Sequence, residues 1–379
     1  MTNKREICVP LEKIGRWEYT PSWFFYVFNR KSFAVAGIKI MSKSSVGKIL
    51  FIVKSLKTPS SRIRALDLLP GLHLAGFECE IEYLPNSFFA RRRLFQKCVD
   101  FDVVVFQKRL LSFFEFSFLR RNAKKLVFDF DDAVYMRNAA PSIDSCDYIS
   151  STRSRRFKRV VKKVDLVIAA NPVLAEMVNS VASKVSVEIV PSSVPIRDYE
   201  AKDDYTFSDP PVIGWVGTSV TMRYLNVLAP ALCELRKKHP FVLRVISNAE
   251  FVCDGIDVEN LTWSLESESR EIRKFDIGVM PLSDDPFSKG KSSYKLLQYM
   301  ACGVPAVASA VGMNIEVADG ERCALLADSP AAFAEKIGEL LVNSKLRQYL
   351  GRAARKKVKE EFERNVVATR LASILKKIC

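Results

Sequence analysis

Three lysines crowd the start of one short predicted helix: Lys289, Lys291 and Lys295. Ser292 and Ser293 favour a helix N-terminus, because their side-chain oxygens can cap free amides. The helix is predicted over residues 294–301, and Gly303 and Pro305 favour its end there. A helix N-terminus attracts negative charge, so the lysines predict a phosphate or carboxylate ligand. The alternative is a solvated lysine-rich loop before an ordinary helix.

A second basic group follows an apolar segment, residues 212–216, that is predicted to form a strand. The strand leads into Gly217 and Thr218, and Arg223 follows on the next predicted helix. Ligands of open α/β sheets bind outside the carboxyl ends of the strands, so these groups are placed for a ligand. The alternative is a surface loop followed by a helix.

Three aspartates end a predicted strand at residues 126–130: Asp129, Asp131 and Asp132. An Asp-x-Asp pair is suited to holding a divalent cation against a diphosphate. The same carboxylates could instead face an acceptor or a transferred sugar, or cap the loop after the strand. The motif is short, so all three interpretations stay open.

Short apolar segments alternate with helical ones and predict two parallel, doubly wound α/β sheets that position these groups. The predicted strands span residues 48–54, 80–83, 103–107, 126–130, 166–169 and 187–190, then 212–216, 243–247, 277–280 and 306–308. A polar segment that ends in two prolines, residues 201–211, predicts the linker. The last helix has an apolar stripe at Val367, Leu371, Ile374 and Ile378. The predicted parts are an extension over 1–44, domains over 45–205 and 206–362, and a final helix over 363–379.

The composition of the 379 residues limits the possible functions. A net charge of +15 and a pI of about 9.4 predict an anionic partner. Nine cysteines without Cys-x-x-Cys spacing argue against a disulfide framework or a zinc site and favour a reducing cytoplasm. With two histidines, a His-based triad or a His-rich metal site is nearly excluded. No apolar segment approaches the ~18 residues that span a bilayer, and no nucleic-acid-binding module is recognised.

Residues 295–309 (Lys-Leu-Leu-Gln-Tyr-Met-Ala-Cys-Gly-Val-Pro-Ala-Val-Ala-Ser) resemble the donor-site segment of family 4 glycosyltransferases. The resemblance extends over most of residues 48–360 and is specific around residues 287–316. It implies a GT-B fold, in which two Rossmann-like domains face a central cleft and the last helix crosses back to the first domain. It also implies retaining transfer from a nucleotide diphosphate sugar to a lipid-linked or surface-polysaccharide glycan, without a metal or other cofactor.

The resemblance assigns roles to individual residues. The expected catalytic residues are Arg223, Lys295 and Asp131, and the expected donor-binding residues are Gly217, Thr218, Lys291, Ser293, Tyr294 and Gln298. The first two catalytic residues would stabilise charge on the leaving diphosphate, and the third would face the acceptor or the sugar. Gln298 would bind the ribose, where the family usually has a glutamate.

Two departures from the family pattern and one short motif keep alternatives open. The first family glutamate falls at Gly290, and Thr218 stands where relatives usually have an arginine. These departures favour a catalytically inactive nucleotide-sugar-binding protein as one alternative. The Asp129 and Asp131 pair favours a metal-dependent, single-domain (GT-A) glycosyltransferase as another. A GT-B sugar epimerase resembles the donor segment less closely.

Basic residues alternate with aromatic ones in the first half of the chain. Phe88 and Phe89 lie beside residues 91–93, all arginine, and similar groups occur over residues 113–125 and 153–163. This mixture favours peripheral contact with an anionic membrane on its inner face; RNA binding or plain solvated helix faces are the alternatives. The aromatic and basic residues of 1–44 predict either a second interfacial contact or a start site assigned upstream of Met41.

Overall fold

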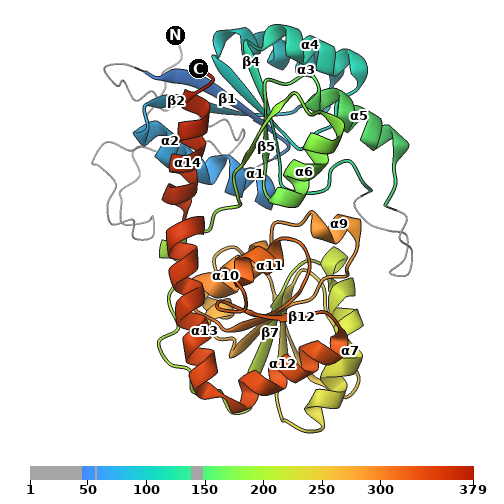
Figure 1. The fold of residues 1–379 in the computed structure, drawn as a ribbon, viewed down its shortest axis with the longest axis vertical. Coiled ribbons are helices and arrows are strands. Elements are labelled where there is room, and N and C mark those ends of the chain that lie inside the picture. The colour runs from blue at the N-terminus through green and yellow to red at the C-terminus, as the bar shows by residue number, and fades with distance from the viewer. Residues whose placement is uncertain (1–44, 56–57, 138–147) are drawn as a thin grey trace, which may run out of the picture. The chain divides into compact units, whose positions relative to one another are not determined.

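The computed structural model describes residues 45–55, 58–137 and 148–379, which all belong to one compact unit spanning Ser42–Cys379. The interpretations of residues 1–44 lie outside the described residues. Two six-stranded sheets form the framework, and helices cover both faces of each sheet (Figure 1). The predicted pair of doubly wound α/β sheets is therefore confirmed.

The first sheet is parallel throughout and has the order β2-β1-β3-β4-β5-β6. Its strands are β1 (Gly47–Val53), β2 (Phe77–Tyr83), β3 (Val103–Gln107), β4 (Lys125–Phe130), β5 (Leu166–Ala169) and β6 (Ser186–Ile189). Alternate residues of β1 pack into different cores, Leu50 and Ile52 on one face and Ile49 and Phe51 on the other. Burial on both faces explains why the strands are continuously apolar in sequence.

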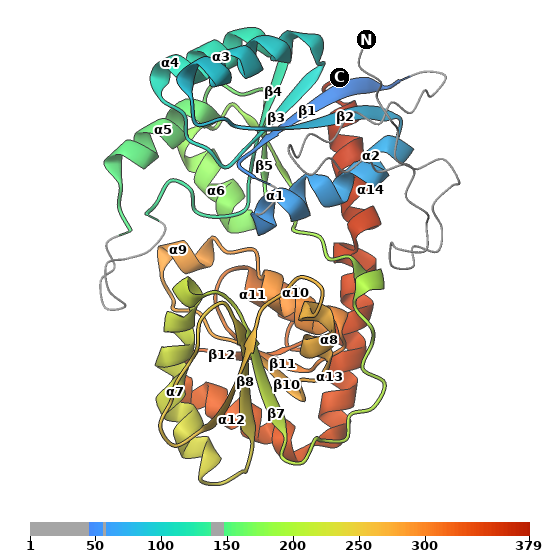
Figure 2. The ribbon, with the colours of Figure 1, turned by 180° about the vertical axis from the view of Figure 1, so that it is seen from behind.

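Helices from distant parts of the chain cover the two faces of this sheet (Figures 1 and 2). One face packs against α3 (Phe88–Lys97), α4 (Phe113–Asn122), α5 (Ser151–Val161) and α6 (Pro172–Val181). On the other side lie α1 (Pro59–Arg64), α2 (Leu69–Leu74) and the last helix, α14 (Arg364–Lys376). Val367, Leu371 and Ile374 of α14 are buried in the same core as β1, so the predicted return of the last helix to the first sheet is confirmed.

The second sheet is also parallel, with the order β12-β11-β10-β7-β8-β9. Its strands are β7 (Val212–Val216), β8 (Val242–Ser247), β9 (Asp257–Thr262), β10 (Ile277–Met280), β11 (Ala306–Ser309) and β12 (Leu325–Ala327). The helices are α7 (Met222–Arg236), α8 (Glu268–Arg273), α9 (Pro286–Lys289), α10 (Tyr294–Ala301), α11 (Met313–Ala318), α12 (Pro330–Val342) and α13 (Ser344–Lys357). Helices α7 and α12 pack on one face, and α8, α10, α11 and α13 pack on the other. No helix in the described ranges combines the length and the apolar character needed to cross a membrane.

The strand order places a possible ligand site in each sheet. In the first sheet the order reverses between β1 and β3, and in the second between β7 and β10. Crevices for ligands open at such reversals, outside the carboxyl ends of the strands. Lys108 follows β3 and Gly217 follows β7, so both residues lie at these points.

Candidate active site

The start of α10 presents free backbone amides at the carboxyl edge of the second sheet. Ser293 precedes the helix in the left-handed backbone region (φ 51°) and makes no side-chain cap. Within the described residues, no acceptor is found for the amides of Tyr294, Lys295 and Leu296, as is usual in a first helical turn. The prediction of serine caps is wrong, because the Ser293 hydroxyl donates to Asn314 Oδ1 (2.7 Å). The amides are thereby left for an anion.

Lys295 is held between the two loops that were predicted to bind the donor. Its Nζ atom lies 4.3 Å from the centre of the Trp215 ring and donates to Thr221 Oγ1 (3.1 Å). Gly217 makes this packing possible, because a Cβ atom there would lie 2.4 Å from the Trp215 ring and 2.6 Å from the Lys295 Nζ. Burial, with a smaller effect from the charge of Lys291, lowers the pKa of Lys295 to about 7.

This pKa predicts that the binding of UDP weakens as the pH rises above neutrality. A diphosphate beside Lys295 favours the charged lysine, so binding is accompanied by proton uptake once the free side chain is neutral. The affinity should be level near pH ~6.5–7 and then fall by up to about tenfold per pH unit for one linked proton. Calorimetry from neutral to alkaline pH measures this, above the phosphate ionisation near pH ~6. Lys295→Arg, which stays charged, should show no fall; a level profile in the parent would exclude the linkage.

Arg223 lies in the first turn of α7, next to this loop. Its guanidinium packs 4.9 Å from the Tyr224 ring centre and donates to the Tyr224 hydroxyl (3.0 Å). The Tyr224 hydroxyl also shares a hydrogen bond with the Ser288 hydroxyl (3.0 Å). The Ser288 hydroxyl in turn donates to the Asp285 carboxylate (2.8 Å). Within the described part of the chain, the buried Nε atom of Arg223 has no hydrogen-bond partner. Thr218 is exposed, and its amide donates to Thr221 Oγ1 (3.1 Å), which makes Thr221 a part of the loop that the sequence did not reveal.

The remaining predicted donor residues differ in their surroundings. Lys291 Nζ lies 4.8 Å from the centre of the Phe287 ring and 6.0 Å from that of Tyr224, at the same loop. Gln298 is 2% exposed, and its amide nitrogen donates to the Tyr199 hydroxyl (2.9 Å). A ribose would have to bind the side-chain carbonyl of Gln298, so the ribose-binding role of this residue stays a prediction.

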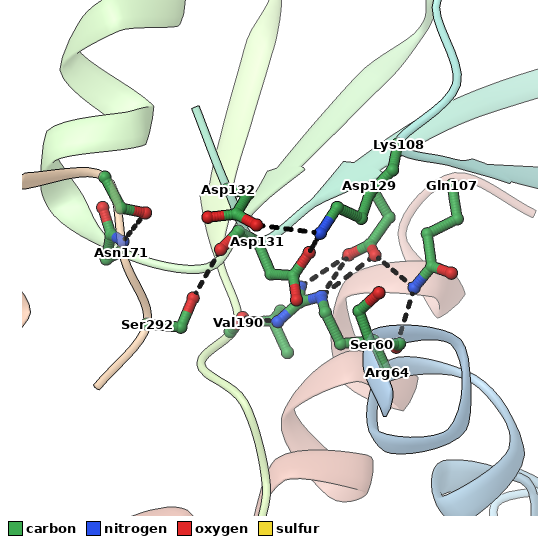
Figure 3. Close-up of polar contacts among 11 residues, drawn as sticks. Ser60, Arg64, Gln107, Lys108, Asp129, Asp131, Asp132, Asn171, Val190 and Ser292 are labelled. Carbon is green, nitrogen blue, oxygen red and sulfur yellow. Dashed lines mark hydrogen bonds and ion pairs between the residues drawn. The ribbon is translucent and has the colours of Figure 1, made fainter. Parts of the chain in front are cut away.

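Asp129 forms a buried ion pair with Arg64 (Figure 3). The Arg64 Nε atom donates to both carboxylate oxygens (3.1 and 3.0 Å), and Nη1 donates to the carbonyl of Val190 (2.9 Å). Gln107 adds a longer contact to the same carboxylate (3.4 Å). The single-domain GT-A alternative is wrong, because the described residues form two sheets and Asp129 is a structural partner of Arg64. No group of three or more His, Cys, Asp or Glu side chains in the described ranges could hold a metal ion.

Lys108 brings Asp131 and Asp132 together at the end of β4 (Figure 3). Its Nζ atom lies 2.8 Å from Asp131 Oδ1 and 3.2 Å from Asp132 Oδ2. Burial would raise the pKa of Asp131, but the charges of Lys108 and Arg64 outweigh it and hold that pKa below its usual value. Lys108 has a left-handed backbone (φ 56°), which is uncommon for a residue with a side chain. In the sequence, its position directly after a strand is the one signal that points to it.

Side chains of the first sheet hold the donor loop of the second (Figure 3). The Asn171 amide nitrogen, just beyond β5, donates to the carbonyls of Gly290 (3.1 Å) and Lys291 (3.3 Å). The hydroxyl of Ser292 donates to the backbone carbonyl of Asp131 (2.8 Å). The site therefore joins a basic, amide-rich donor side to an acidic side. Like Thr221 and Lys108, Asn171 is a residue that the sequence did not reveal.

Comparisons with known proteins bear on the fold and on the class of enzyme. Residues 210–343 match the family model described as "Glycosyl transferases group 1". No curated protein matches the chain in sequence. Sucrose-phosphate synthase from Thermosynechococcus elongatus has a similar fold, with a TM-score of 0.68 and 15% identity over 87% of this chain and 98% of that chain.

Two further solved structures are similar. HepE from Anabaena, in complex with UDP and glucose, has a TM-score of 0.65 and 13% identity over 87% of this chain and 100% of that chain. A glycosyltransferase from Rickettsia africae has a TM-score of 0.67 and 14% identity over 87% of this chain and 98% of that chain. The matched domain and the shared two-sheet fold support a glycosyltransferase enzyme of the GT-B type.

Proposed function

We propose that this enzyme is a retaining, family 4 glycosyltransferase that moves a sugar from a nucleotide diphosphate sugar to a lipid-linked or surface-polysaccharide glycan. The observation that carries the proposal is the uncapped start of α10, where free amides lie in the same short segment as Lys291 and Lys295. A diphosphate offers the matching negative charge. UDP is the nucleotide to try first, because HepE was solved with it.

On the donor side, the basic groups would stabilise the charge that develops on the leaving diphosphate. Lys295 and Arg223 approach from α10 and α7, the two helices that begin next to the predicted phosphate position. Lys291 adds charge, Gly217 leaves room for Lys295 to pack against Trp215, and Thr218 adds a hydroxyl group. Fixed donors aimed at developing charge are the largest single contribution in many enzymes. Gln298 is proposed to bind the ribose through its carbonyl side.

On the acceptor side, Asp131 and Asp132 would bind hydroxyl groups of the acceptor or of the transferred sugar. The lowered pKa of Asp131 keeps it ionised, so it accepts hydrogen bonds. Lys108 positions both carboxylates, and a left-handed backbone at a residue other than glycine is often found at functional sites. In retaining transfer on one face of the sugar, the leaving phosphate takes the acceptor proton. A chain with two histidines can therefore carry out the reaction.

The test is transfer by the full chain from a panel of nucleotide diphosphate sugars, with nucleoside diphosphate release measured with and without EDTA. We expect slow release of the nucleoside diphosphate without an acceptor and faster release with glycan acceptors. EDTA should leave the rate unchanged within about twofold, because positively charged side chains take the place of a metal. Loss of activity in chelator, restored by magnesium or manganese, would contradict the metal-free mechanism.

A catalytically inactive nucleotide-sugar-binding protein is the second candidate. Gly290, where the family usually has a glutamate, packs against the first domain: a Cβ atom there would lie 3.1 Å from Ala133 Cβ and from Leu174 Cδ2. A larger side chain at this position would require its neighbours to shift, and the absence of the family glutamate favours this candidate. Tight UDP binding without any sugar release from the panel would support it.

A further inference from the structure

Four phenylalanines form an exposed surface on two neighbouring helices of the first sheet. Phe88 and Phe89 open α3, and Phe113 and Phe114 open α4; we call these four residues the phenylalanine patch. They are 55%, 76%, 55% and 79% exposed. Each pair follows a serine, Ser87 or Ser112, so the two helices begin with the same Ser-Phe-Phe sequence. Exposed apolar side chains that gather in this way mark an interaction surface.

The contacts below the patch hold the two pairs together. Arg91 of α3 forms an ion pair with Glu115 of α4 (2.6 Å), and its Nε atom donates to the carbonyl of Pro85 (2.5 Å). Glu115 also completes the capping box of α4 with Ser112. Helices α3 and α4 lie side by side in both views (Figures 1 and 2). The patch is therefore a fixed arrangement and not two unrelated helix ends.

Positive charge surrounds the patch. Helices α3 and α5 contain no acidic residue, and α4 contains only the paired Glu115. Exposed basic residues lie on these helices and on the connection before α4: Arg92, Arg93, Arg109, Arg121, Arg155 and Lys158. The Arg159 guanidinium of α5 packs 5.1 Å from the centre of the Phe113 ring. Aromatic side chains within a basic surface suit the headgroup region of an anionic bilayer.

We propose that the phenylalanine patch and its basic surround form the surface by which this protein docks onto an anionic lipid bilayer. A second copy of the chain would bring the same positive surface against this one, and this repulsion argues against it. The patch begins the helices that leave the carboxyl ends of β2 and β3, and residues 109–112 alone separate Lys108 from it. Docking there would place the acidic side of the candidate active site near the bilayer. The link to a lipid-linked acceptor rests on the proposed function; the docking itself does not.

The test is co-sedimentation of the full chain with vesicles of phosphatidylcholine, with and without phosphatidylglycerol. The parent should bind the anionic vesicles, and added salt should weaken binding as it screens the charges. The double variant Phe89→Ser, Phe114→Ser should bind more than about tenfold more weakly, since two exposed aromatic rings no longer enter the interface. The matched control is Val252→Ser, Val342→Ser, which removes two apolar side chains that are 81% and 72% exposed elsewhere, and it should bind like the parent.

Three outcomes would overturn the docking surface. They are equal binding by the patch variant and the parent, equal partition onto neutral and anionic vesicles at low salt, and binding of single-stranded RNA without vesicle binding. UDP calorimetry on the same variants keeps this proposal separate from the proposed function. Loss of vesicle binding with unchanged UDP affinity supports the docking surface. Loss of both would show that the variant is misfolded. In that case the double variant Arg92→Gln, Arg93→Gln replaces it, and this variant should weaken binding to anionic vesicles without changing the UDP affinity.

Discussion

Replacement of Lys295 by alanine should weaken the binding of UDP roughly 10- to 100-fold, because a charge-assisted hydrogen bond contributes about 1.5–3 kcal/mol. The lysine reaches the loop after β7 and the start of α10 together, so its loss affects the point where the phosphates are expected. Arg223→Ala should have a similar effect, because its guanidinium lies next to the same loop and its Nε atom lacks a partner among the described residues. Isothermal titration of each variant measures the change.

Lys289→Ala is the matched control for this experiment. Lys289 lies in the same loop, but it is half exposed and already paired with Asp284 (2.9 Å), so its loss should change the UDP affinity little. Lys295→Ala should not lower the melting temperature of the free protein, since burial of a lysine charge is itself unfavourable. Unchanged UDP binding in both Lys295→Ala and Arg223→Ala would contradict the donor-site assignment.

Asp129→Asn should strongly destabilise the first domain. Breaking a buried ion pair from one side costs about 3–5 kcal/mol, because the other charge stays buried without compensation. Arg64 and Asp129 side chains are only 2% and 6% exposed, so water cannot replace the lost partner. For a domain of this size, such a loss corresponds to a fall in melting temperature of about 10 °C. Thermal unfolding monitored by circular dichroism measures it.

Two controls separate this effect from a general loss of charge. Glu234→Gln removes the partner of Lys237 in a pair whose side chains are 70% and 68% exposed, and it should change stability by less than ~1 kcal/mol. The double variant Arg64→Met, Asp129→Leu should recover much of the lost stability, because no charge stays buried. An Asp129→Asn protein that melts with the parent would refute the structural role of Asp129.

The strands of both sheets could largely be predicted because they are short, apolar and buried on both faces. Two strands were not predicted. One is β12 (Leu325–Ala327), which is only three residues long. The other is β9, with the sequence Asp-Val-Glu-Asn-Leu-Thr, which lies at the edge of its sheet and is half-buried or exposed throughout. No apolar run marks such a strand, since only its pairing with β8 makes it one. The end of α10 could be predicted because it depends on one local residue. Gly303 has a positive φ (69°), which glycine adopts easily.

Side-chain partners at the site could not be predicted in the same way. Serine is a residue type that often caps helices. The hydroxyls of Ser292 and Ser293 nevertheless donate hydrogen bonds to the Asp131 carbonyl and to Asn314, which are distant in sequence. The buried ion pair between Arg64 and Asp129 likewise joins residues that lie 65 positions apart. Spacing along the chain reveals local capping and periodicity, whereas these contacts depend on how strand ends meet in three dimensions.

The most direct measurement is a crystal structure of the full chain with UDP. We expect the terminal phosphate to lie within hydrogen-bond distance of the amides of Tyr294 and Lys295. We also expect the Lys295 Nζ atom and the Arg223 guanidinium to contact the same diphosphate. Electron density for UDP at any other place, with the first turn of α10 still unbound, would contradict the assignment of the donor site.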